Sequence, residues 1–332
     1  MAPQSTRWDA FSKTAKARTR WFATITFIAP VANVDSTILK LPLKEGFRFT
    51  GLSEQKARNL LAHLEQTTPW TASKQFLLGH PYFNMEEKVV YFIENSIPVE
   101  PLKEGQDWWS TYFKELVTFE NQKVLGYLLP TLRKLKLFSR GNIGVANWYY
   151  YEIENLTPKL YMGHTGGGPT MGHGRLHLEE SDLKPAIRFL DRVQMPLPIP
   201  YLKLAFENFE LSYQAPSNGL SFLTLMICLE TLFNPGEGEV RHRIARNVAV
   251  ALGETTEQSE ELYARIKRYY HVRSKMVHSG KTDSLKRDDV PELRELCRVA
   301  LKGLVEAGMD KGVLMADLNK RSFGSPITPR NP

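Results

Sequence analysis

Alternation of apolar and polar residues predicts strands in the first part of the chain. Near its start, apolar side chains alternate with threonines in the run Ala23, Thr24, Ile25, Thr26, Phe27. A period of two residues is the pattern of a half-buried strand. Similar short runs at 38–43, 89–93 and 148–153 predict further strands. Apolar residues at helical spacing predict a helix behind the candidate cap Ser53 and a longer helical stretch over 108–138. We therefore expect an α+β domain over residues 21–197.

From residue 198 onward the apolar positions follow a helical period instead. Spacings of three and four residues predict helices over 202–213, 220–233, 241–252, 260–278 and 290–305. Gly280 is the expected cap at the end of the fourth helix, and Asp289, with Glu292 three residues later, is the expected cap at the start of the fifth. Prolines at 196, 198 and 200 break the helical pattern and mark the domain boundary. We expect an all-α bundle over 198–310, followed by a C-terminal tail over 311–332.

Two other segments are polar. The first 20 residues are basic and are expected to form a flexible arm or, as the alternative, a phosphate-binding tail. The segment 162–177 contains six glycines together with His164, His173 and His177. It matches neither of the common glycine-rich phosphate-binding motifs, and its histidines lack regular metal-ligand spacing. We expect an exposed loop there, and neither a metal nor a cofactor in the chain.

Composition narrows the class of protein without naming a function. Of the 332 residues, 42% are hydrophobic and 24% are charged, as in a folded globular chain. Lys and Arg outnumber Asp and Glu by 43 to 36, and a formal charge of +7 favours an anionic partner such as nucleic acid. Cys228 and Cys297 both fall within apolar helical patterns and fit a reducing compartment. The apolar run at 21–32 is too short to cross a membrane. These features predict a soluble, cytoplasmic protein without membrane contact.

The most informative residues lie at the end of the predicted fourth helix. Arg273 and His278 stand five residues apart in the run YHVRSKMVHSG at 270–280. That spacing alone arises easily by chance, but the neighbouring sequences LETLF at 229–233 and RHRIARNVA at 241–249 make the pattern more specific. Together they make the stretch from 220 to 304 resemble the Apea-like branch of the HEPN superfamily.

This resemblance implies a helical bundle that dimerises. Many HEPN proteins are metal-independent ribonucleases in which Arg-x4-6-His motifs from two protomers meet in one cleft, whereas others are inactive binding or assembly modules. The resemblance implies Arg273 and His278 as the catalytic pair. An imidazole ordinarily titrates near neutral pH, and a guanidinium offers a charged planar fork to phosphate oxygens. Because five residues of α-helix turn through about 140°, the two side chains do not share a face, which favours a site built from two chains.

Three further residues are supporting candidates, each with a structural interpretation beside the functional one. Ser274 follows the motif arginine and either orients phosphate or caps a turn. Glu230 matches an acidic position of the family, and either forms an ion pair with Arg246 or Arg273 or takes part in catalysis. Lys275 either contacts RNA or is simply solvated.

Two functions fit these observations. The first is a homodimeric HEPN endoribonuclease that acts on RNA, in a defence or toxin-like system, with the first domain sensing a regulatory protein or ligand or gripping the substrate. The second is a non-catalytic HEPN module that binds RNA, a nucleotide or a protein. A third, catalysis in the first domain, has little support, because we recognise no nucleophile, base and acid set there.

Overall fold

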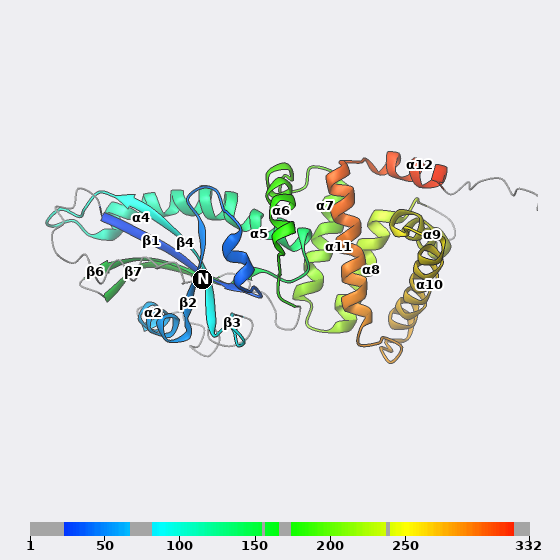
Figure 1. The fold of residues 1–332 in the computed structure, drawn as a ribbon, viewed down its shortest axis with the longest axis horizontal. Coiled ribbons are helices and arrows are strands. Elements are labelled where there is room, and N and C mark those ends of the chain that lie inside the picture. The colour runs from blue at the N-terminus through cyan, green and yellow to red at the C-terminus, as the bar shows by residue number, and fades with distance from the viewer. Residues whose placement is uncertain (1–22, 67–81, 155–156, 166–173, 237–239, 322–332) are drawn as a thin grey trace, which may run out of the picture. The chain divides into compact units, whose positions relative to one another are not determined.

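The computed structural model describes residues 23–66, 82–154, 157–165, 174–236 and 240–321 (Figure 1). The chain divides into two compact units, residues 1–188 and residues 189–332. The first contains an antiparallel sheet with helices, and the second is entirely helical in its described part. The expected order, an α+β region followed by an all-α region, is therefore confirmed.

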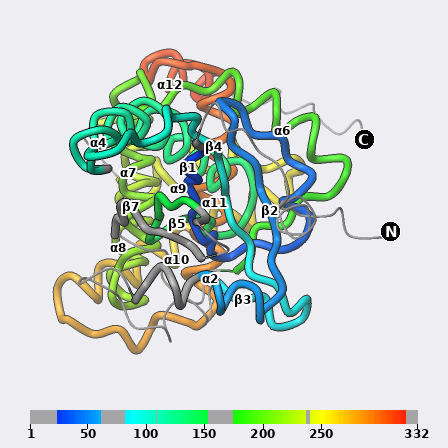
Figure 2. The backbone as a smooth tube through the Cα atoms, turned by 90° about the vertical axis from the view of Figure 1, so that its left-hand side faces the viewer, coloured from blue at the N-terminus to red at the C-terminus, as the bar shows by residue number. Residues whose placement is uncertain are grey.

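A seven-stranded antiparallel sheet organises the described residues of the first unit. Its main path runs in the order β2-β4-β1-β6-β7, and the short strands β3 and β5 pair with β4 and β1. The strands are β1 (Ala23–Ala32), β2 (Arg48–Ser53), β3 (Phe83–Asn84), β4 (Val89–Val99), β5 (Gly144–Val145), β6 (Asn147–Glu154) and β7 (Thr157–Thr165). β1 lies at the centre between β4 and β6, and Figure 2 shows β2 and β4 running side by side.

Helices cover both faces of this sheet (Figure 1). On one face lies a continuous helical stretch formed by α4 (Trp108–Phe119), a π-helix (Glu120–Leu128) and α5 (Leu129–Phe138). The ring of Phe27 on β1 packs there against Phe119 at 5.9 Å between centroids. On the other face, α2 (Glu54–Gln66) places Ala57 and Leu60 in the same buried cluster as Ile28. Neighbouring residues of β1 thus point to opposite faces. The alternation predicts only the half-buried start of the strand, and residues 27–32 are buried on both faces.

Two expectations for the first unit were wrong. Residues 38–43 do not form a strand, because a 3₁₀ helix, η1 (Ser36–Lys40), occupies the first half of this segment. The side chain of Asp35 accepts hydrogen bonds from the backbone N–H and the hydroxyl of Thr37, which favours a turn over an extended chain. The expected loop at 162–177 begins later than predicted, because β7 continues to Thr165. Residues 166–173 and the expected arm at 1–20 lie outside the described residues.

The second unit is built from packed helices. They are α7 (Pro200–Gln214), α8 (Asn218–Phe233), α9 (Val240–Leu252), α10 (Thr256–Ser279), α11 (Asp289–Ala307) and α12 (Lys311–Arg321), and α6 (Glu180–Arg192) lies across the division between the units. The five predicted helices are confirmed. The expected tail instead begins with α12, whose Leu314 and Leu318 are buried one turn apart.

Of the two helix caps predicted from the sequence, one is confirmed and one is wrong. Gly280 follows α10 with a left-handed φ of 67°, and its N–H donates to the Met276 carbonyl, as predicted. Asp289 is not the cap of α11, because Asp288 occupies that position. The buried carboxylate of Asp289 instead accepts from Arg268 at 2.5 and 3.0 Å and from the Lys286 backbone N–H at 2.8 Å. An ion pair to α10 has therefore taken the place of the expected capping box.

Candidate functional site

Arg273 lies on the flank of α10 that faces α8. Its Nε is 3.0 Å from Oε1 of Glu230, and a terminal nitrogen donates to Oε2 at 3.4 Å. The side chain of Arg273 is 33% exposed and that of Glu230 is 22% exposed, so the ion pair is partly buried. Of the two partners predicted for Glu230, the structure selects Arg273. The other terminal nitrogen of Arg273 makes no hydrogen bond to a described residue.

Glu230 also lies against Tyr270, one helical turn before Arg273. Burial, followed by the negative charge of nearby Glu230, raises the pKa of the Tyr270 hydroxyl above its ordinary value, although this hydroxyl makes no hydrogen bond to a described residue. The phenol therefore stays protonated and uncharged beside the ion pair of Arg273 and Glu230. Tyr270 is the first residue of the run at 270–280, and its proximity to Glu230 on α8 does not follow from spacing within α10.

His278 lies in the last turn of α10 with its side chain exposed. It shares one side of the helix with His271, Ser274 and Lys275, which are also exposed. Ser279 donates its hydroxyl to the Lys275 carbonyl and thereby closes the last turn. Arg273 is about 140° away around the helix axis, so one chain does not bring Arg273 and His278 to the same point.

Exposed apolar side chains surround the Arg273 side of this arrangement. Val277, one turn after Arg273, is 56% exposed. On α8, Ile227 lies one turn before Glu230 and is 41% exposed, and Leu220 two turns further back is 48% exposed. A half-exposed ion pair bordered by exposed aliphatic residues is typical of a surface that another chain can cover.

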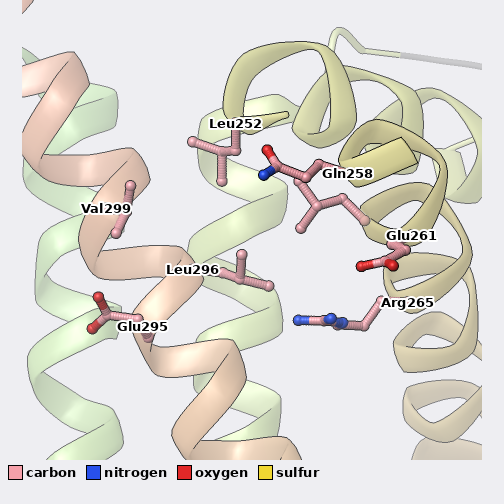
Figure 3. Close-up of a pocket in the computed structure, with 8 residues that line it drawn as sticks. Leu252, Gln258, Glu261, Arg265, Glu295, Leu296 and Val299 are labelled. Atoms are coloured by element: carbon pink, nitrogen blue, oxygen red, sulfur yellow. The ribbon is translucent and has the colours of Figure 1, made fainter. Parts of the chain in front are cut away.

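A pocket of about 260 Å³ lies elsewhere in the second unit, among α9, α10 and α11 (Figure 3). Its apolar lining comes from Leu252, Leu262, Leu296 and Val299, and its polar lining from Gln258, Glu261, Arg265 and Glu295. Arg265 and Glu261 both point towards Leu296 from the first half of α10. Neither Arg273 nor His278 lines this pocket, and none of the eight residues is a histidine, cysteine or serine. The predicted site is thus a surface of the helical unit and not this cavity.

The other candidates from the sequence do not gather into a site. His177 makes an exposed ion pair with Asp35 at 2.7 Å, His164 lies on β7, and His173 falls outside the described residues. Within the described ranges, no three His, Cys, Asp or Glu side chains are close enough together to hold a metal ion. None of the described helices is both long and apolar enough for a membrane span. Cys228 and Cys297 are buried free thiols.

Comparison with known proteins gives no match to a family model, a curated protein or a solved structure.

Proposed function

We propose that the helical unit is a HEPN-like endoribonuclease whose site forms where Arg273 and His278 of two copies of the chain meet. The observation that carries this proposal is their placement on α10. His278 is exposed in the last turn, whereas Arg273 is half-buried on the other side of the same helix. A rigid helix cannot direct the side chains of Arg273 and His278 towards the same phosphate. In a two-fold symmetric dimer, the second copy can supply whichever of these side chains the first copy directs away. The exposed residues Val277 and Ile227 support a second copy covering the Arg273 side.

The proposed reaction is an internal transesterification of RNA. The ribose 2'-oxygen forms a bond to the neighbouring phosphorus, and the bond from phosphorus to the 5'-oxygen breaks. One histidine accepts the 2'-hydroxyl proton, and a second, protonated histidine donates a proton to the leaving oxygen. Two copies of His278 provide both groups, and Arg273 stabilises the negative charge on the phosphoryl oxygens. The products are a 2',3'-cyclic phosphate and a 5'-hydroxyl.

The second candidate function is a non-catalytic module that binds RNA or another partner. The observation that favours it is the fork of contacts from Arg273 to Glu230, because a carboxylate already neutralises the cation that phosphate would need. In the nuclease, RNA has to compete with Glu230 for Arg273. In the module, the ion pair only fixes α10 against α8.

The deciding experiment measures cleavage of labelled single-stranded RNA and transfer RNA by the full-length protein in EDTA. We expect cutting by the wild type, with cyclic phosphate ends. We expect His278→Ala to reduce the rate by about 100-fold or more, the usual contribution of a proton-transfer group. His177→Ala is the histidine control, since His177 is also exposed but belongs to the first unit, and it should cut like the wild type.

Arg273 needs a separate control because its removal also affects folding. Arg273→Ala leaves Glu230 without its ion pair and should cost about 1–2 kcal/mol of unfolding free energy. Glu230→Gln breaks the same pair but leaves the guanidinium in place. A nuclease loses cutting in Arg273→Ala and keeps it in Glu230→Gln. Equal cutting by all variants, or cutting by the wild type only when Mg²⁺ is added, would exclude the proposed site, and RNA binding without any cutting would support the module.

A further inference from the structure

Basic residues are concentrated on two neighbouring helices of the second unit. α9 contains Arg241, His242, Arg243 and Arg246 and no acidic residue. Along α10, no acidic residue occurs between Glu261 and Asp283, a stretch with Arg, Lys and His at seven positions up to Ser279. The excess of basic over acidic residues per unit length is therefore much greater here than in the whole chain, whose formal charge is +7 over 332 residues.

Only some of these cations are neutralised within the chain. Arg268 pairs with Asp289 and Arg273 pairs with Glu230, both on the sides of α10 that face other helices. On the remaining side, Lys267, His271, Lys275 and His278 follow one another at intervals of four, four and three residues. None of these four has an ion pair to a described carboxylate, and the last three are exposed. They therefore form one continuous cationic edge.

This edge continues onto α9 through Tyr263. The Tyr263 hydroxyl lies 2.7 Å from Nδ1 of His242, and Nζ of Lys267 lies 5.1 Å from the centre of the same ring. Arg241, the neighbour of His242 in the first turn of α9, is exposed and has no ion pair to a described carboxylate. Cations near the end of α10 suit the helix dipole, but cations in the first turn of α9 oppose it. Helix stability therefore does not explain the whole arrangement.

We propose that Arg241, His242, Lys267, His271, Lys275 and His278 form a basic track that binds the phosphate backbone of single-stranded RNA. Between Lys267 and His278 the helix rises by about 16 Å, which suits a run of consecutive phosphates more than one isolated anion. The cations alternate with imidazole rings, whose faces can stack on unpaired bases. The track ends at His278, so a strand bound along it passes the proposed cleavage site. The choice of RNA rests on the proposed function, but binding can be tested without cleavage.

The test uses a fluorescein-labelled single-stranded RNA in which every ribose carries a 2'-O-methyl group, so that no 2'-hydroxyl is available for the cutting reaction. Binding to the full-length protein is followed by fluorescence anisotropy between about 0.05 and 0.2 M salt. The track variant is Lys267→Gln/Lys275→Gln. The matched control is Lys184→Gln/Lys203→Gln, which removes the same charge from exposed positions on α6 and α7. Circular dichroism checks that both variants are folded.

We expect the track variant to bind roughly tenfold more weakly at the lower salt concentration, whereas the control binds like the wild type. Its slope of log affinity against log salt should become shallower by about 1.4, since each lost single-strand phosphate contact contributes about 0.7. Equal weakening in the two variants, or an unchanged slope in the track variant, would overturn the track. Binding of the wild type to vesicles containing phosphatidylserine, with no binding to the RNA, would overturn it in favour of a membrane surface.

The experiments distinguish a wrong basic track from a wrong proposed function. Normal RNA cutting with unaltered binding by the track variant removes the track and leaves the nuclease. Track-dependent binding of the modified RNA, with no cutting of ordinary RNA, removes the nuclease and leaves the track.

Discussion

At the residue scale, Arg294 on α11 is a buried charge whose partners are a hydroxyl and a backbone carbonyl, not a carboxylate. It is 7% exposed, and it donates to the Ser212 hydroxyl at 3.1 Å and to the Ser212 carbonyl at 3.0 Å. Its guanidinium lies 4.5 Å from the centre of the Tyr213 ring. Ser212 is in the last turn of α7, where unpaired carbonyls carry partial negative charge. Arg294 thus acts as a helix cap delivered from another helix.

A second residue pair, Asp35 and His177, predicts a pH dependence for the first unit. Burial alone would raise the pKa of Asp35, but hydrogen bonds from Thr37 and His177 outweigh it and hold the pKa below its ordinary value. The hydrogen bond to Asp35, followed by its charge, raises the pKa of His177 above its ordinary value. The stabilisation from Asp35 is lost as pH falls through its lowered pKa. The stabilisation from His177 is present at low pH and is lost as pH rises through its raised pKa.

The pair should therefore contribute most at mildly acidic pH, between the two transitions. Thermal unfolding of the wild type and of His177→Gln, measured across this range, checks the prediction. The difference in midpoint between them should be largest at mildly acidic pH and should shrink towards both lower and higher pH. A difference that stays constant with pH would contradict an ionic role for the pair. Because the His177 side chain is 60% exposed, solvent screening keeps the effect small.

At the scale of an element, the π-helix between α4 and α5 carries a buried acid. Glu120, 8% exposed, begins this segment. Its carboxylate accepts from Nε1 of Trp148 at 3.2 and 3.1 Å and from the Tyr150 hydroxyl, both on β6. Burial, followed by the hydrogen bond to Glu120, raises the pKa of Tyr150 above its ordinary value, so the phenol remains a donor. The acid thus fastens the helical layer to the sheet.

We expect the effects of substituting Glu120 and Tyr150 on the free energy of unfolding to be coupled, because the two side chains share a hydrogen bond. Glu120→Gln and Tyr150→Phe should each lower the free energy of unfolding by about 1–2 kcal/mol, because each leaves buried polar groups imperfectly paired. The double variant should lose less than the sum of the two, since both substitutions break the same hydrogen bond. Urea unfolding followed by tryptophan fluorescence measures all four proteins. Strict additivity would show that the two side chains stabilise the unit independently.

The elements that sequence periodicity predicted best are those whose burial is decided locally. β1, β4, β6 and the helices of the second unit follow their apolar periods, and Gly280 ends α10 where its chemistry requires. Periodicity failed at 38–43, where the hydrogen bonds from Thr37 to Asp35 favour a turn. It was also not applied to 311–321, where Leu314 and Leu318 stand at helical spacing and form the buried side of α12.

The candidate site was predictable only along α10 itself. The positions of Arg273 and His278 on different sides of this helix follow from their spacing, and the structure agrees. Contacts between helices do not follow from spacing within one helix. The sequence therefore left two possible ion-pair partners for Glu230 and predicted no contact for Tyr270. The carboxylate of Glu120 and the guanidinium of Arg294 were missed for the same reason, because a single charged residue within a helix ordinarily indicates a solvated face.

At the scale of the whole molecule, each unit buries a core of its own. Phe27 and Tyr150 belong to the first unit, and Phe222 and Tyr269, with ring centroids 5.7 Å apart, belong to the second. Units with separate cores need not unfold together. We therefore expect differential scanning calorimetry of the full chain to resolve two transitions, one for each unit.

Two substitutions assign these transitions. Glu120→Gln should lower the midpoint of one transition only, and Arg294→Ala, which uncovers the end of α7, should lower only the other. A loss of about 2 kcal/mol in a unit of this size corresponds to a shift of roughly 4–8 °C, well above the precision of the method. If either substitution moves both transitions equally, or if a single transition responds to both, the two cores unfold cooperatively. Two transitions that respond separately would show instead that each core is stable by itself.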